Sequence, residues 1–324
     1  NMTKKRKPLP IGHSDFRELL GNNHYYIDKS LFIREIHESG AKVLLIPRPR
    51  RFGKTLNLSM LRYFYEKSNE DRSSLFDGLA IQDDEVFETH QGKYPVIFLT
   101  FKDLKDLSWD SMFRGLTNIL RDEFLRHSII LDSDVLSEPE IGYFESVIKG
   151  KAELRDYADA LRNLSSYLCR VSKQRVVILI DEYDTPIHAG YVHGYYEEVI
   201  AFMRNFLSGG LKDNENLFRG VITGILRVAK ESVFSGLNNL GVHTLLSPRF
   251  SDIFGFTEPE VVRLLECYDM GDRYDDVSRW YDGYRFGKTM IYNPWSVLNY
   301  ADNMGDAKPY WINTASTEII DSLV

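Results

Sequence analysis

Short apolar runs alternate with amphipathic stretches along the first 250 residues of the chain. Four of these runs are rich in β-branched residues and are bounded by turn or charged residues, which is typical of strands buried on both faces. They span residues 43–46, 96–99, 176–180 and 220–225. Because helical stretches separate them, the pattern predicts an α/β fold with a mainly parallel sheet flanked by helices.

The stretches between these runs carry apolar residues at helical spacing, so we expect them to form helices that cover the sheet. They span residues 56–65, 111–124, 152–171 and 195–207. Two shorter helices, joined by a turn at residues 21–23, are expected between residues 15 and 39. Residues 1–40 are therefore expected to form a helical segment that packs on a core at residues 41–250.

The pattern changes after about residue 250, where aspartate, tyrosine and arginine become frequent. A helix is expected to start at Thr257, because a threonine N-cap with Pro259 and Glu260 in the first turn is a favourable capping arrangement. Residues 251–324 are therefore expected to form a small, mostly helical appendage. The sequence ends at Leu323 and Val324 without an evident closing signal, so the natural protein is expected to continue into a further domain.

A loop follows the first expected strand and ends in Gly53, Lys54 and Thr55, directly before a helix. Such a strand, loop and helix wrap backbone N–H groups around phosphate oxygens and present the positive end of the helix dipole to the same anion. Gly53 allows close approach, Lys54 supplies charge to the outer phosphates, and the Thr55 hydroxyl can bind Mg²⁺. These residues predict a P-loop, or Walker A motif, for a nucleotide.

The loop departs from the general pattern G-x-x-x-x-G-K-[ST], because Arg48 stands where that pattern has its first glycine. Pro47 and Pro49 restrict the backbone instead, and the arginines are expected to add positive charge near the polyphosphate. The residues expected to bind nucleotide here are Arg48, Pro49, Arg50, Arg51, Phe52, Gly53, Lys54 and Thr55. The alternative is a structural turn in which Gly-Lys-Thr occurs by chance.

The same five residues, Arg-Phe-Gly-Lys-Thr, occur again at 285–289, which provides an internal comparison. The second copy does not follow a buried strand, and Asn293 and Pro294 interrupt any helix soon after it. We therefore expect the second copy to form a turn between short strands.

The third expected strand ends in two adjacent carboxylates, Asp181 and Glu182, as a Walker B strand does. Ligands collect at the carboxyl ends of parallel strands, so these acids are expected to meet the phosphate loop there. Asp181 is expected to hold Mg²⁺ with Thr55, and Glu182 to orient or deprotonate the attacking water. The alternative is a solvated loop after a core strand.

Three residues near these strand ends are candidates for supporting roles. Thr223, at the tip of the fourth expected strand, is expected to sense the γ-phosphate, and Arg227 to stabilise charge in the transition state. The alternative for Arg227 is a surface residue that opens a helix. Asp184 is expected to cap the helix that follows the two acids.

Six segments, at residues 25–29, 48–55, 179–184, 235–239, 254–258 and 280–284, carry a resemblance that covers most of the chain. Together they resemble the AAA-ATPase-like family of bacteria and archaea, whose members are often fused to a C-terminal PD-(D/E)XK nuclease-like domain. The resemblance implies a P-loop NTPase core of the additional-strand type. It also implies that Arg48 is a family trait and that a nuclease-like domain follows residue 324 in the natural protein. Tyr26 and Asp28, in the first segment, are expected to help hold the adenine base.

Composition limits the possible classes of protein. The 324 residues are 43% hydrophobic and 27% charged, enough for a sizeable core, and the formal net charge of −7 argues against a surface that binds nucleic acid everywhere. The two cysteines lack the spacing of a disulfide framework or zinc knuckle. No apolar run approaches the ~20 residues that span a bilayer, and no signal peptide is evident. The sequence therefore predicts a soluble, cytoplasmic protein without a membrane partner.

The leading expectation is an ATPase that uses ATP and Mg²⁺, and whose nucleotide state switches the appendage and through it a partner or effector domain. One alternative is a nucleotide-responsive binding module with little or no turnover. Another is the ATPase part of a DNA-processing or defence protein, for which nucleic acid would be a partner. The choice between ATP and GTP and the oligomeric state stay open at this point.

Overall fold

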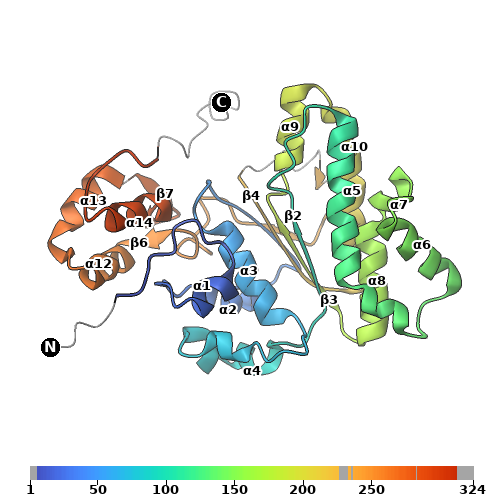
Figure 1. The fold of residues 1–324 in the computed structure, drawn as a ribbon, viewed down its shortest axis with the longest axis horizontal. Helices are drawn as coiled ribbons and strands as arrows, with labels where there is room; N and C mark the ends of the chain where they lie inside the picture. The colour runs from blue at the N-terminus through green and yellow to red at the C-terminus, as the bar shows by residue number, and fades with distance from the viewer. Residues whose placement is uncertain (1–5, 226–232, 235, 282, 312–324) are drawn as a thin grey trace.

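A five-stranded parallel sheet forms the centre of the protein (Figure 1), with the strand order β2-β3-β4-β1-β5. The computed structural model describes residues 6–225, 233–234, 236–281 and 283–311. The strands are β1 (Val43–Pro47), β2 (Val96–Thr100), β3 (Val176–Asp181), β4 (Leu217–Gly224) and β5 (Leu240–Val242). Four of them confirm the expected strands. The short β5 was not expected, because its three residues do not form a buried apolar run.

Strand β4 lies between β1 and β3, so the strand that enters the phosphate loop and the strand that ends in the acids are not neighbours. Ile46 of β1 pairs with Thr223 of β4, and Ile180 of β3 pairs with Ile222. All three strands therefore end at the same level of the sheet. This additional strand confirms the P-loop NTPase fold that the sequence predicted.

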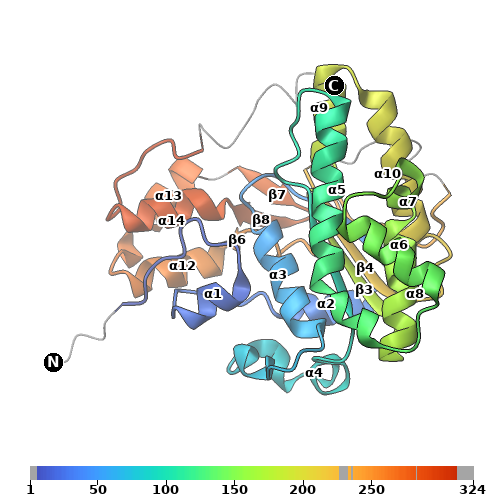
Figure 2. The same ribbon diagram turned by 45° about the vertical axis from the view of Figure 1, so that its right-hand side comes forward.

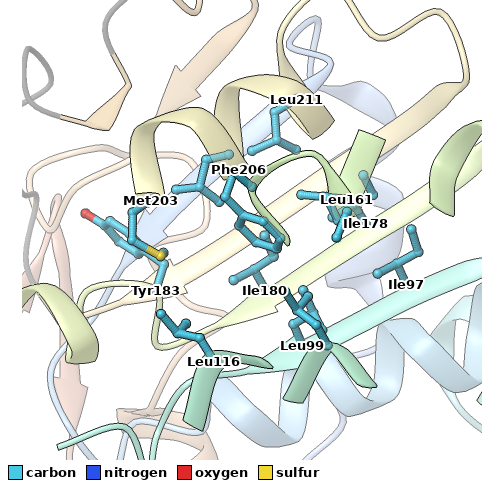
Figure 3. Packing of buried hydrophobic residues seen from close by; sticks show 14 of the residues in the cluster. Ile97, Leu99, Leu116, Leu161, Ile178, Ile180, Tyr183, Met203, Phe206 and Leu211 are labelled. Carbon is cyan, nitrogen blue, oxygen red and sulfur yellow. The ribbon is translucent and has the colours of Figure 1, made fainter. Parts of the chain in front are cut away.

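Helices cover both faces of the sheet (Figures 1 and 2). On one face, α5 (Trp109–Arg126), α8 (Ala160–Ser172) and α10 (Tyr196–Leu211) pack against the strands. Figure 3 shows this packing, in which Ile178 and Ile180 of β3 meet Phe206 of α10. The alternate strand residues Val177 and Leu179 face the other side, where α2 (Leu31–Glu38) and α3 (Lys54–Tyr65) cover them.

The expected helix at residues 152–171 is divided at Asp159 into α7 (Leu154–Ala158) and α8. The other expected core helices form, each extended by a few residues. The remaining core helices are α1 (Phe16–Gly21), α4 (Glu85–His90), α6 (Glu138–Ile148) and α9 (Thr185–His193). Short 3₁₀ helices lie at Ser73–Phe76, Ala80–Asp83, Ser128–Asp132 and, in the appendage, Gly271–Arg273. None of the described helices is both long enough and apolar enough to cross a bilayer.

The appendage combines three helices with a small antiparallel sheet of order β6-β8-β7. Its helices are α12 (Glu258–Cys267), α13 (Tyr274–Tyr281) and α14 (Pro294–Asp302), and its strands are β6 (Phe256–Thr257), β7 (Tyr284–Phe286) and β8 (Thr289–Tyr292). Thr257 and Glu260 form the expected capping box of α12. The second Arg-Phe-Gly-Lys-Thr copy lies in the β7–β8 hairpin, as predicted.

The N-terminal segment lies between the core and the appendage (Figure 1). On the core side, the Tyr63 hydroxyl donates to Asp15 Oδ2 at 2.9 Å and the Phe16 amide donates to Ser59 Oγ at 3.0 Å. On the other side, apolar residues of the segment pack into the core of the appendage: Leu9, Ile11, Tyr25 and Ile27. The segment thus contacts more than the core, and the division of the chain at residues 40 and 250 stays a prediction.

Candidate functional site

The phosphate loop leaves β1 and turns into α3 at Gly53, whose φ of +81° is the left-handed conformation that glycine adopts without strain. Gly53 occupies the N-cap position of α3, and no side chain caps the helix there. The first N–H groups of an α-helix have no partner within the helix. This helix end can therefore accept an anion.

The carboxylate of Asp181 is the meeting point of three hydroxyl groups from three elements. Thr55 Oγ1, in the first turn of α3, donates to Asp181 Oδ2 at 2.6 Å, and Thr223 Oγ1 of β4 donates to Oδ1 at 2.8 Å. Thr100 Oγ1, at the end of β2, lies 3.5 Å from Oδ2. Asp181 is fully buried, so these contacts hold its carboxylate in one orientation.

Lys54 lies near the acids that follow β3, namely Asp181, Glu182 and Asp184. Its side chain is 4% exposed, and its Nζ donates to the carbonyl of Pro49 at 2.9 Å. Burial lowers the pKa of Lys54, against the opposing influence of the carboxylates of Glu182, Asp181 and Asp184. The loop and the acids therefore share one electrostatic site at the carboxyl end of the sheet.

Glu182 has a φ of +50°, which is uncommon for a residue with a side chain. Its carboxylate accepts a hydrogen bond from the Thr185 hydroxyl at 3.1 Å. Such backbone strain costs about 1–3 kcal/mol and clusters at functional sites. Asp184 occupies the expected N-cap position of α9, but its carboxylate accepts the Ile225 amide at 2.9 Å and makes no capping hydrogen bond.

A cavity of about 330 Å³ opens beside the phosphate loop, within the usual size range of small-molecule sites. Three parts of the chain line it: the N-terminal segment, the loop with the start of α3, and the appendage. Of the residues expected to act in the site, the lining includes Tyr26, Arg51, Phe52, Gly53, Lys54, Thr55 and Glu182. Asp181 and Thr223 are absent from the cavity lining, but Asp181 accepts a hydrogen bond from Thr55, which lines it, and Thr223 donates to Asp181.

The side chain of Arg48 has a different environment from the one that the sequence predicted. It is fully buried, absent from the cavity lining, and bonded to backbone carbonyls, including those of His243 and Phe250. Nη1 and Nη2 donate to carbonyls away from the cavity, and Nε has no hydrogen-bond partner among the described residues. The role of Arg48 near the polyphosphate therefore stays a prediction.

The side chain of Asp28, which was expected to help hold the adenine base, bonds backbone amides of the protein. Its carboxylate accepts the amides of Ser30 and Ala80 at 2.8 and 2.7 Å, which fixes the start of α2 and the loop before the Ala80–Asp83 turn. Pro49 is absent from the cavity lining. Its carbonyl contributes to the site only indirectly, by accepting a hydrogen bond from Lys54 Nζ. Arg50 is exposed, and Arg227 lies outside the described residues.

The remaining loop residues pack on neighbouring parts of the chain. The Arg51 guanidinium lies 4.1 Å from the ring centroid of Trp295 in the appendage. Phe52 is fully buried, with its ring 4.8 Å from Tyr284 and 5.3 Å from Phe286. The phenylalanines of the two Arg-Phe-Gly-Lys-Thr copies therefore contact each other, which no local pattern in the sequence indicated.

Tyr26 forms part of the cavity wall on the N-terminal side. Its hydroxyl lies 3.5 Å from Met60 Sδ and accepts the Lys29 amide at 3.3 Å. Burial raises the pKa of Tyr26 far above its usual range, so the hydroxyl is neutral. The ring is thus fixed on the surface of α3 beside the phosphate loop.

Sequence reasoning missed two contributors to the site. Thr100 follows an apolar strand run directly, as Thr223 does, so the signal that singled out Thr223 could also have found it. Trp295 has no comparable local signal, since it opens a helix of the appendage 240 residues after the phosphate loop.

The donors present fit a nucleotide with Mg²⁺. A buried ammonium and an uncapped helix end suit phosphate, and a hydroxyl beside a carboxylate suits Mg²⁺, which commonly takes one or two protein ligands and completes its shell with water and phosphate. Among the described residues, no group of three or more His, Cys, Asp or Glu side chains could hold a metal by itself. A magnesium site here would therefore depend on the bound phosphates.

Comparison with known proteins identifies a similar relative and a family. The chain is 29% identical over 322 residues to a protein of Azotobacter chroococcum mcd 1, described as an uncharacterized protein in the vnfD 5′ region. The match covers 98% of this chain and 56% of the relative, so the chain spans about half the length of that protein. Residues 10–234 match the model of a family described as predicted AAA-ATPase. Because this match covers well over half of the chain, the protein belongs to the AAA-ATPase-like family.

Proposed function

We propose that the protein is a Mg²⁺-dependent ATPase whose nucleotide state changes the position of the appendage at residues 251–324, and thereby acts on a partner or an effector domain. Membership of the AAA-ATPase-like family supports nucleotide binding by the P-loop fold. The observation that carries the proposal is the 2.6 Å hydrogen bond from Thr55 Oγ1 to Asp181 Oδ2. It brings the two expected halves of the site, 126 residues apart in the chain, into contact.

The phosphates would bind at the N-terminus of α3, where backbone N–H groups and the helix dipole favour negative charge. Lys54 is already buried beside this position and can exchange the carbonyl of Pro49 for a phosphate oxygen. Arg51 lines the cavity, and the exposed Arg50 lies close enough to influence Lys54 electrostatically. These cations offset the acids and make the site attractive to a polyanion.

Thr55 and Asp181 would hold Mg²⁺, which when bound neutralises charge on the outer phosphates. Thr100 and Thr223 support this role because their hydroxyl groups fix the orientation of the Asp181 carboxylate. Thr223 would also respond to the γ-phosphate through the same carboxylate, to which it donates a hydrogen bond.

Glu182 would orient the attacking water and accept its proton. The carboxylate lies on the cavity wall beside Lys54, and the strained backbone at Glu182 is maintained by the surrounding structure. Arg227 retains its proposed role in stabilising transition-state charge, although it lies outside the described residues.

The base of the nucleotide would lie farther along the cavity, between the N-terminal segment and the appendage. Tyr26 supplies an aromatic wall on one side, and Pro294 and Trp295 supply apolar surface on the other. Asp28 would act only indirectly, by fixing the turn that follows Tyr26. A base held in this way would contact two parts of the protein at once.

The proposed switch follows from contacts between the phosphate loop and the appendage. Arg51 lies over the ring of Trp295, and Phe52 packs on Tyr284 and Phe286. A change in the loop on binding or release of phosphate would therefore act directly on the appendage. Closure of one part of a protein over a bound ligand is a common form of switching.

Thermal-shift and phosphate-release assays with ATP and GTP, each with and without Mg²⁺, test the proposal. ATP with Mg²⁺ should raise the melting temperature, because a ligand that binds the folded state stabilises it. Glu182→Gln should keep this shift and reduce phosphate release by about 100-fold or more. Glu198→Gln, on the exposed side of the neighbouring α10, is the matched control and should behave as wild type.

Two outcomes would redirect the proposal. Binding of ATP without phosphate release from the wild-type protein would favour a nucleotide-responsive binding module. Unchanged release from Glu182→Gln would show that Glu182 does not act in the reaction, and another group would then have to orient the attacking water.

A further inference from the structure

Arg48 is a fully buried arginine at a position where the general P-loop has glycine. Its Nη1 donates to the carbonyls of Pro47 and His243, each at 2.8 Å, and its Nη2 donates to the carbonyl of Phe250 at 3.1 Å. The guanidinium also lies 5.4 Å from the ring centroids of both Phe254 and Phe286. Arg48 therefore joins the first residue of the phosphate loop to several segments that come much later in the chain.

No carboxylate pairs with this cation among the described residues. Burial lowers the pKa of Arg48 to about 10, so the side chain stays charged at neutral pH. An arginine fits here because its planar group can bond carbonyls in several directions while its faces contact aromatic rings. A lysine would supply a point charge without that geometry.

The two carbonyls of His243 and Phe250 lie at the two ends of one segment that connects the core to the appendage. Residues 243–250, here called the connector, lead from β5 toward the appendage, and Arg48 bonds the carbonyls of its first and last residues. The connector also touches the second Arg-Phe-Gly-Lys-Thr copy, because the Gly287 amide donates to the Leu245 carbonyl at 2.6 Å. The Arg48 guanidinium also contacts the appendage directly, through the rings of Phe254 and Phe286.

We propose that Arg48 is a positioning residue that couples the phosphate loop to the appendage, so that ATP binding and docking of the appendage strengthen each other. The inference rests on the proposed nucleotide site and adds the residue that regulates it. Coupling between two equilibria is reciprocal, so the factor by which docking improves ATP affinity equals the factor by which ATP improves docking. This role also accounts for an arginine in place of the usual glycine.

The test measures both sides of the coupling in the whole chain for wild type, Arg48→Met, Arg48→Gly and Arg48→Lys. ATP affinity is measured by titration, and docking is measured by the rate of trypsin cleavage after Arg249 in the connector, which reports the open population. In wild type, ATP should slow this cleavage. Arg48→Met and Arg48→Gly should raise the Kd for ATP about tenfold or more, speed cleavage without nucleotide, and reduce protection by ATP.

A purely structural role would affect these readouts only through overall stability. Leu161→Ala removes a buried side chain on the opposite face of the sheet and is the control for destabilisation. It should lower the melting temperature but leave ATP affinity and cleavage after Arg249 near wild type. Arg48→Lys keeps the charge and should fall between wild type and Arg48→Met, so it decides the question should Arg48→Met fail to fold.

The outcomes separate this inference from the proposed function. Failure of the wild-type protein to bind ATP would refute the nucleotide site, and the cleavage rates without nucleotide would still test whether Arg48 holds the connector. If wild type binds ATP and the Arg48 variants match it in Kd and cleavage, the coupling role is wrong. Tighter ATP binding by Arg48→Gly would also overturn it.

Discussion

The ion pair between Lys29 and Glu260 joins the N-terminal segment to the appendage and can be perturbed cleanly. Lys29 Nζ lies 2.8 and 2.7 Å from the two carboxylate oxygens of Glu260 and 2.6 Å from the carbonyl of Asp252. The two side chains are 8% and 15% exposed. Lys29→Met would leave the acceptors without their donor, while Glu260→Gln would keep the side-chain oxygen that accepts the Thr257 amide in the capping box.

The magnitude follows from the burial of the pair. Removing one partner of a buried ion pair costs about 3–5 kcal/mol, because the other charge stays buried and unpaired. Glu260 keeps some exposure, so we expect about 3 kcal/mol for Lys29→Met. For a chain of 324 residues this corresponds to a decrease in melting temperature of roughly 4–5 °C. Burial lowers the pKa of Lys29 against the opposing effect of Glu260, so loss of the carboxylate also leaves the lysine easier to deprotonate.

A double-mutant cycle with urea or thermal unfolding measures the pair directly. Lys29→Met with Glu260→Gln should cost less than the sum of the single changes by about 1.5–3 kcal/mol. The control is Lys149→Met, which removes a pair of 2.6 Å with Glu145 in which both side chains are about half exposed. It should change stability by ~0.5 kcal/mol or less. A coupling near zero for Lys29 and Glu260 would refute the view that this pair holds the N-terminal segment to the appendage.

Two further predictions concern pH and the phosphate loop. Burial, with the nearby His90 and Arg219, lowers the pKa of His37 from 6.5 to about 4, so the unfolded chain binds a proton at a higher pH than the folded one. Stability measured by urea unfolding should therefore fall as pH drops from about 6.5 toward 4, and His37→Gln should flatten that decrease; an unchanged profile would contradict it. Gly53→Ala should cost about 1–2 kcal/mol and weaken ATP binding, whereas Gly92→Ala, with a similar φ of +69°, should cost as much and leave ATP affinity unchanged.

Local patterns determined the class of fold and much of the candidate site. The apolar runs at 43–46 and 176–180 identified buried strands because a strand covered on both faces needs apolar residues at nearly every position. The capping box at Thr257 was recognisable because it depends on residues within one helical turn. The comparison of the two Arg-Phe-Gly-Lys-Thr copies also succeeded, since the elements on either side of each copy are local.

Longer-range features needed the tertiary structure. The break at Asp159 and the short strand β5 carry no strong local signal, and their positions depend on packing against distant elements. Thr55 and Asp181 were expected to meet, but the hydrogen bond between them follows from the order of strands in the sheet. The roles of Thr100 and Trp295 likewise depend on which elements become neighbours.

Arg48 shows most clearly which features the sequence determines and which depend on the tertiary structure. The sequence by itself determined that a positive residue replaces glycine at the start of the phosphate loop. Because this residue lies in a phosphate loop, we expected its side chain to point toward phosphate. Only the tertiary structure decided that its guanidinium points to the carbonyls of His243 and Phe250. The physical reason is that a buried polar group must find partners wherever the folded chain provides them, and these acceptors lie about 200 residues away. Local sequence specifies which groups are available, whereas packing decides which groups meet.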